Sequence, residues 1–294
     1  MAKPKKSVPP PPDPASAAAK IEEPKIKWST IGLIAAAVLV LWVTSFMMVP
    51  TIGYWGVGVV GVLTLVAAGF GFYVWRLARR SRAIVDILKS ATDAPSRKAA
   101  LEKLSAGDEK DALNALARAQ LVAQEKPTEA IEILEKVDLK KAPVMVQDDV
   151  RANLAFLYLM TGRMRDARGL ADDIRLDRSP HAKSKAMYAA VIAESFSRTG
   201  KHDEARKLLE TYKDDDPEYG EMSALLLRAQ VYTYFATKNR GLARKAMEKL
   251  VGRDANMLAS FMQKGAPIEL QKMAREVLTG SGLGPKVKMK VQRR

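Results

Sequence analysis

The longest feature of the hydropathy pattern is an uninterrupted apolar run. Residues 28–75 contain no Asp, Glu, Lys or Arg. A helix needs about 20 apolar residues to cross a bilayer core about 30 Å thick, so the run suffices for two crossings. Pro50 and Gly53 interrupt it near its middle, because proline lacks a backbone N–H and glycine permits a turn. We therefore predict a transmembrane hairpin with helices at 29–49 and 53–75.

Small residues recur within the apolar run at a spacing of four. Examples are Thr64 with Ala68 and Ala67 with Gly71. Small side chains let two helices approach closely in a membrane. We expect them to pack the hairpin against itself, with a dimerisation face as the alternative.

Beyond residue 82 the apolar positions take the spacing of amphipathic helices, and the pattern repeats. Leu-Ala-x-x-Tyr-x-x-x-Gly-x-x-x-x-Ala begins at Leu154, and Ile-Ala-x-x-Phe-x-x-x-Gly-x-x-x-x-Ala follows 38 residues later at Ile192. The last alanine recurs in four copies, because only a small side chain lets paired helices touch. We predict four helix pairs over 111–252. The residues expected at their contacts and turns are Ala130, Ala155, Tyr158, Gly162, Ala167, Ala193, Phe196, Gly200, Ala205, Tyr234 and Ala243.

This motif resembles the tetratricopeptide repeat, with its small residue where two helices cross, its aromatic residue, its turn glycine, its alanine and a closing proline. The outer copies depart from it, since Glu125 and Lys238 stand at the glycine position. The resemblance implies a solenoid that binds peptides along the face formed by each repeat's first helix. By the family's geometry that face holds Ala115, Ala119, Ala152, Phe156, Leu159, Ala190, Glu194, Arg228, Tyr232 and Phe235. Such a groove suits an amphipathic helix or an aromatic-rich segment; alternatively, the chain's own C-terminal helix fills it.

The segments around the hairpin and the repeats differ in composition. Residues 1–27 are rich in proline, alanine and lysine and have little to bury, which is typical of disorder. The predicted divisions are a disordered arm at 1–27, the hairpin with its basic exit at 28–82, linking helices at 83–110, the repeats at 111–252, two capping helices at 253–279 and a flexible basic tail at 280–294.

The formal net charge of +15 is concentrated outside the repeats. The cations that flank the apolar run are Lys25, Lys27, Arg76, Arg79, Arg80 and Arg82. Basic residues favour the cytoplasmic side, so we expect both termini in the cytoplasm, with a bacterial inner membrane as the setting. The tail carries five more cations and is a candidate for binding anionic lipid. Since the repeats have no basic stripe, we expect no nucleic-acid partner.

Residues that carry out chemistry are scarce. The chain has no cysteine and two histidines, His181 and His202, both placed in turns. The acidic run 214–216 lacks the glycine and distal glutamate of a calcium loop, so we interpret it as a solvated turn. We therefore expect no metal, no cofactor, no catalytic residues and no enzymatic activity.

The sequence favours a membrane-anchored scaffold or adaptor that binds protein partners at the cytoplasmic face. The alternative is a regulatory or assembly subunit of an integral membrane complex that associates through its hairpin. Two N-terminal passes followed by repeats are similar to the HemY-like proteins of bacterial inner membranes. That resemblance is one of architecture alone and implies no haem-related activity.

Overall fold

A computed structural model describes residues 28–91, 94–107, 111–123, 125–263 and 265–282. The regular elements in these ranges are α-helices and short 3₁₀-helices, which confirms the all-α fold class. Contacts divide the chain into two compact units, and the chain passes from one unit to the other between residues 100 and 101. The predicted arm and most of the predicted tail lie outside the described residues, and the predicted domain limits stay predictions.

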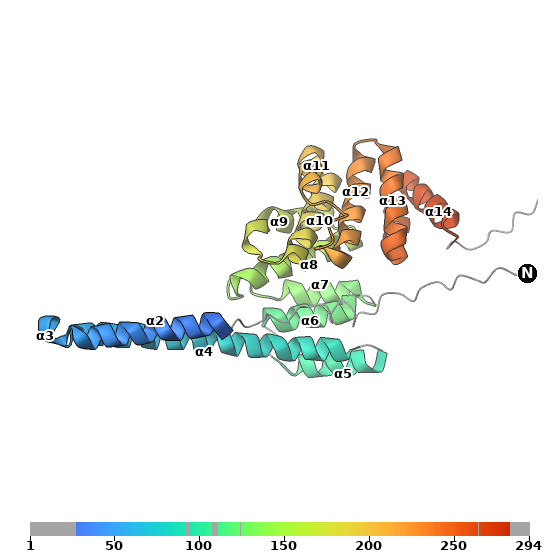
Figure 1. The fold of residues 1–294 in the computed structure, drawn as a ribbon. Coiled ribbons are helices and arrows are strands. Elements are labelled where there is room, and N and C mark those ends of the chain that lie inside the picture. The colour runs from blue at the N-terminus through green and yellow to red at the C-terminus, as the bar shows by residue number, and fades with distance from the viewer. Residues whose placement is uncertain (1–27, 92–93, 108–110, 124, 264, 283–294) are drawn as a thin grey trace, which may run out of the picture. The chain divides into compact units, whose positions relative to one another are not determined.

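The first unit contains a helical hairpin. Figure 1 shows α2 and α4 side by side, with α3 at the turn between them. Pro50 lies in the first turn of α3, and Gly53 ends that helix with φ 66°, so the chain turns where the sequence predicts. The elements are α2 (Trp28–Met47), α3 (Val49–Ile52), α4 (Trp55–Ser90) and α5 (Ala94–Ser105). The last of these crosses the limit between the two units.

The two long helices of the hairpin are joined by a hydrogen bond. Trp42 Nε1 in α2 donates to Thr64 Oγ1 in α4 at 3.1 Å. Ala68 is exposed, and a Cβ placed on Gly71 meets no atom within 4 Å. The expectation that these small residues pack the hairpin tightly is therefore wrong at these two positions. At Thr64 the contact between the two helices is made by the Trp42 indole.

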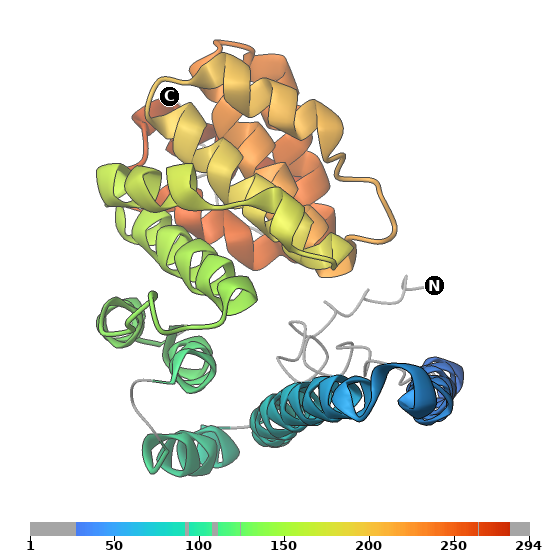
Figure 2. The same cartoon turned by 90° about the vertical axis from the view of Figure 1, so that its left-hand side faces the viewer.

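The second unit stacks paired helices one after another (Figure 2). Within each pair the two helices contact each other, and each first helix also contacts the first helix of the next pair. The pairs are α6 (Ala112–Ala123) with α7 (Pro127–Glu135), α8 (Val144–Thr161) with α9 (Met164–Asp173), α10 (Ala182–Arg198) with α11 (His202–Thr211), and α12 (Ser223–Ala236) with α13 (Arg240–Asp254). Two 3₁₀-helices, η1 (Leu176–Arg178) and η2 (Gly220–Met222), lie between pairs.

The alanines of the motif are at the helix contacts. All six have no exposed surface, so a larger side chain has no room there. They are Ala130, Ala155, Ala167, Ala193, Ala205 and Ala243. Tyr158 is also buried, whereas Phe196 and Tyr234 are only partly covered.

A shared hydrogen bond repeats the 38-residue period in the last three pairs. After each turn, a backbone N–H bonds to the carbonyl of the motif's aromatic residue, which satisfies an orphan carbonyl at the helix end. The bonds join Arg163 to Tyr158 at 2.8 Å, Lys201 to Phe196 at 2.9 Å and Asn239 to Tyr234 at 2.8 Å.

The turn that precedes this bond requires a left-handed residue. Gly162 and Gly200 have φ values of 85° and 95°, and Lys238 takes the same place with φ 61°. A side chain in this conformation brings Cβ close to the following carbonyl oxygen, at a cost of about 1–2 kcal/mol. The fourth repeat thus keeps the turn geometry of its neighbours despite lacking their glycine.

We expect Lys238→Gly to raise the free energy of unfolding by about 1 kcal/mol, because glycine relieves the strain at positive φ. Gly200→Ala introduces the same strain and should lower the free energy of unfolding by a similar amount. Thermal unfolding of the two variants beside the parent protein checks the pair. A loss of stability in Lys238→Gly would show that the lysine makes a contact that outweighs its backbone strain.

The last elements extend the array by a shorter pair. They are η3 (Ala255–Met262) and α14 (Ile268–Gly280), so the first of the two predicted capping helices is a 3₁₀-helix. The inward face of α14 presents Leu270, Ala274 and Val277, and its outward face is mainly polar. A polar outer face is what a solenoid needs at its end.

Candidate functional site

The face assigned to peptide binding is formed by the first helices, among which α10 lies against both α8 and α12. Phe156 and Phe235 are its partly exposed members. The other assigned residues are buried: Ala115, Ala119, Ala152, Leu159, Ala190, Glu194, Arg228 and Tyr232. These buried residues therefore do not line an open groove, and the peptide-binding role of the face stays a prediction. Neighbouring first helices meet through small alanines, and they approach closely enough to cover the side chains between them.

A buried ion cluster lies at the centre of this face. Glu194 Oε1 accepts hydrogen bonds from Arg228 Nη2 and from Arg198 Nη1, both at 2.9 Å. Arg198 Nη1 also bonds to the Leu159 carbonyl at 2.9 Å, and Arg228 contacts the Met160 sulfur. The cluster therefore ties α8, α10 and α12 together.

The cluster contains one carboxylate and two guanidinium groups, so its charges do not balance. The side chains of Arg228 and Glu194 are 1% and 3% exposed, and that of Arg198 is 12% exposed. Aromatic rings cover the guanidinium groups. The Cζ of Arg228 lies 5.2 Å from the centroid of the Phe156 ring, and that of Arg198 lies 4.5 Å from the centroid of the Tyr232 ring. Ring faces attract cations, so they offset part of the cost of burying the unbalanced charge.

The chain's C-terminal helix does not take the place of a peptide on this face. The main contacts of α14 are with η3 and α13. Phe261 in η3 packs on the Tyr232 ring with centroids 5.1 Å apart. In the described part of the chain, η3 and α14 thus continue the array instead of lying along α8 and α10.

A second polar contact joins the second and third pairs. Tyr188 in α10 donates to Asp149 Oδ1 in α8 at 2.5 Å. Burial raises the pKa of Asp149, as does the charge of Asp148, although the Tyr188 hydrogen bond and His181 oppose this rise. The folded protein therefore binds a proton at Asp149 more readily than the unfolded chain does.

We expect this raised pKa to appear in the pH dependence of stability. The ionised carboxylate destabilises the folded state at neutral pH, and this penalty disappears as pH falls through the folded pKa toward 3.8. Asp149→Asn removes the titration, so its stability relative to the parent should be greatest at neutral pH and should decline in acid. Chemical denaturation across this range measures the difference, with the exposed Asp173→Asn as control. A difference that does not change with pH would contradict the assignment.

The hairpin exposes most of its apolar side chains. Among the described residues, 22 large hydrophobic side chains are exposed, and 19 of them lie between Leu33 and Trp75. In the part of the chain that the structure describes, one helix is long and apolar enough to cross a membrane; its segment Trp55–Tyr73 has a mean hydropathy of 1.9 and no buried residue. The apolar segment Ala36–Thr51, which runs from α2 into α3, is shorter.

The flanking cations are described only in part. Arg76 and Arg79 are exposed on α4, and the Arg79 guanidinium lies 5.5 Å from the Trp75 ring centroid. Arg80 and Arg82 belong to the same helix. Lys25 and Lys27 lie outside the described residues.

The comparison with known protein families identifies the repeats. Residues 121–191 match the tetratricopeptide repeat family. The array is tetratricopeptide-like. The matched segment contains α7, α8 and α9, and thus includes one of the two copies in which the sequence motif is complete. No curated protein and no solved structure matches the chain.

Tetratricopeptide domains are generally non-catalytic scaffolds. No three His, Asp or Glu side chains among the described residues are grouped to hold a metal ion. Asp214 is not the solvated turn residue that the sequence predicts. It accepts hydrogen bonds from Gln230 at 3.0 Å and Lys249 at 3.1 Å, which hold its turn against α12 and α13.

The sequence does not reveal how Glu194 and Arg228 are used. Both were assigned to the peptide-binding face, yet they form a buried ion pair. Glu194 and Arg198 are four residues apart on one helix, and this spacing is the only signal of the cluster in the sequence. Arg228 is 34 residues away from Glu194, and their pairing follows only once α10 and α12 are adjacent.

Proposed function

We propose that the protein is a membrane-anchored tetratricopeptide scaffold, which gathers protein partners at the cytoplasmic face of a membrane. The observation that carries the proposal is the hairpin surface. Its 19 exposed large hydrophobic side chains lie in a segment without charged residues. Monomeric soluble proteins rarely expose an apolar surface of this extent, which makes lipid its natural surroundings.

The partner-binding role rests on the repeats. Tetratricopeptide repeats generally bind proteins, and a rigid helical array offers a preformed surface that loses little entropy on binding. Phe156 and Met160 are partly exposed and contact Arg228 of the ion cluster, in which the Arg198 side chain is 12% exposed. This combination of apolar side chains with a cation suits a peptide that carries apolar residues and a carboxylate.

A second candidate function is a subunit that joins a membrane complex through its hairpin. Four glycines of α4 favour it, since a Cβ placed on any of them meets no atom within 4 Å. They are Gly58, Gly61, Gly69 and Gly71. Glycine surfaces let another helix approach closely within a membrane.

We expect the hairpin to cross the membrane twice, with both chain ends in the cytoplasm. Since the chain has no cysteine, Thr51→Cys and Ser281→Cys each introduce a single thiol. An impermeant maleimide should label Thr51→Cys in intact cells and should label Ser281→Cys only after the membrane is opened. Labelling of Ser281→Cys in intact cells would contradict the cytoplasmic assignment, and release of the protein by alkaline carbonate would contradict the anchor.

A further inference from the structure

We infer that the hollow between α13 and α14 docks onto the headgroups of an anionic lipid bilayer. The hollow has a volume of about 540 Å³ and is lined by Arg244, Lys272, Arg275, Glu276, Thr279 and Gly280. The inference rests on the proposed membrane anchor. It adds a second contact with the bilayer, made by the folded repeats.

Charge is distributed unevenly along the repeats. Residues 111–239 contain 20 Lys and Arg against 21 Asp and Glu, whereas residues 240–280 contain eight against four. The positive excess of the array therefore belongs to its C-terminal end. The basic residues that follow residue 285 add to it. Basic residues near an anionic bilayer are attracted to its surface, and salt weakens this attraction.

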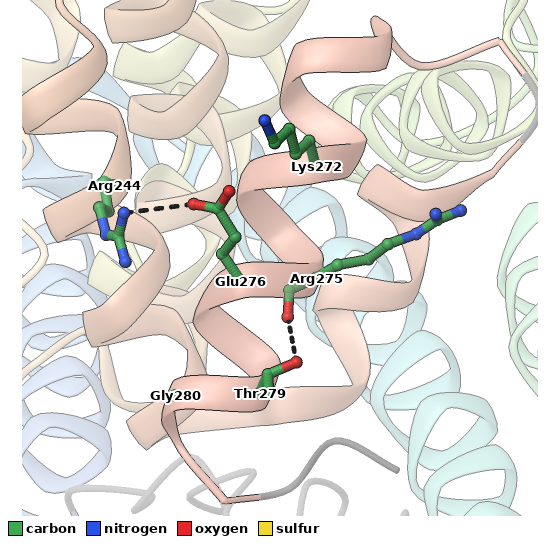
Figure 3. A pocket seen from close by; sticks show the side chains of 6 residues that line it. All are labelled: Arg244, Lys272, Arg275, Glu276, Thr279 and Gly280. Carbon is green, nitrogen blue, oxygen red and sulfur yellow. Dashed lines mark hydrogen bonds and ion pairs between the residues drawn. The ribbon is translucent and has the colours of Figure 1, made fainter. Parts of the chain in front are cut away.

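The hollow has one carboxylate, which is paired, and two cations that are not. Glu276 pairs with Arg244 at 3.3 Å, and Arg244 also pairs with Glu248 at 3.3 Å. Lys272 and Arg275 form no ion pair with any described residue of the chain. Figure 3 shows the Arg275 side chain extending away from the Arg244–Glu276 pair.

The chemistry of the hollow fits phosphate oxygens. An arginine donates in a planar fork and a lysine acts as a mobile point charge, and both bind phosphate. Lipid is the source we favour over a soluble anion, because the anchor would present many headgroups at high local concentration.

A dye placed in the hollow tests the docking. Among the described residues, the Thr279 hydroxyl donates only to the Arg275 carbonyl of its own helix, at 2.8 Å. Thr279→Cys therefore supplies a single thiol for labelling with little disturbance of the structure. The full chain carrying an environment-sensitive dye there is placed in nanodiscs of phosphatidylcholine, with or without phosphatidylglycerol. We expect the emission to shift to the blue only when phosphatidylglycerol is present, and to return as salt rises.

Charge-neutral variants assign the shift to the hollow. Lys272→Gln with Arg275→Gln should abolish it. Arg165→Gln with Lys207→Gln removes the same two charges from exposed positions on α9 and α11, and should leave it intact. A shift that survives in the first variant, or no shift at all, would overturn the proposal.

Other probes separate the sources of the anion. A shift caused by inorganic phosphate in pure phosphatidylcholine nanodiscs would assign the hollow to a free anion, and one caused by a polyglutamate peptide would assign it to an acidic protein. Either result overturns lipid docking. If the chain fails to enter nanodiscs, the result contradicts both the membrane anchor and the docking. If the chain enters the nanodiscs but the dye does not respond, the result contradicts the docking alone.

Discussion

Glu194→Gln is expected to lower the free energy of unfolding of the repeats by about 3–5 kcal/mol. The carboxylate is 3% exposed and accepts hydrogen bonds from Arg198 and Arg228, so its neutralisation leaves two guanidinium groups without a counter-charge. Arg198 then keeps its hydrogen bond to the Leu159 carbonyl, but Arg228 remains charged and buried. The measurement is chemical denaturation of the repeats, followed by circular dichroism.

Two further variants separate burial from charge. Glu210→Gln breaks an exposed pair with Arg206, whose atoms are 3.7 Å apart, and should change stability by less than about 1 kcal/mol. Glu194→Gln combined with Arg228→Met removes the unpaired cation and should recover much of the loss, because apolar replacements of buried ion pairs are tolerated. Equal effects of Glu194→Gln and Glu210→Gln would contradict the central position of the cluster.

Ala205→Leu is expected to cost about 1–3 kcal/mol, because it adds three carbons to a contact with no free surface. Ala167→Leu should behave alike, since the two residues occupy the same place in successive repeats. Lys207→Leu adds a comparable apolar side chain to an exposed position of the same helix and should change stability by about 0.5 kcal/mol or less. Thermal unfolding of the three variants ranks them. If Lys207→Leu costs as much as Ala205→Leu, the repeat register is wrong.

The helix pairs of the repeats follow directly from the sequence. An alanine that recurs every 37 or 38 residues indicates the same size limit at each helix contact. In the structure none of these alanines has any exposed surface. The turn glycines encode positive φ in the same way. Lys238 shows the limit of that reasoning, because the structure imposes the turn on a residue that does not favour it.

The exposure of the expected peptide-binding face was less predictable, because it depends on how neighbouring helix pairs approach each other. A period along one helix says which residues share a face, but not how far the next helix covers that face. Leu159 and Tyr232 occupy the expected face and are nevertheless covered. Phe156 remains partly exposed on the same face.

The hairpin is predictable for a simpler reason. A segment of 48 residues without a charge, broken by Pro50 and Gly53, has few ways to satisfy its backbone other than two helices. The continuation of α4 to Ser90, beyond the basic residues, follows from a helical pattern without a proline or glycine. The Trp42–Thr64 hydrogen bond does not follow, because it depends on the rotation of α2 against α4.

The most direct test of the anchored-scaffold account exchanges the two halves of the protein. One chain keeps the repeats but carries an unrelated two-pass hairpin in place of residues 28–75; a second chain keeps residues 1–91 and lacks the repeats. Each is purified from membranes in mild detergent beside the parent protein, and the copurifying proteins are compared by mass spectrometry. We expect the first chain to retain the parent's partners and the second to lose them. Partners that follow the hairpin and are lost with its exchange would contradict the scaffold and establish the membrane-subunit alternative.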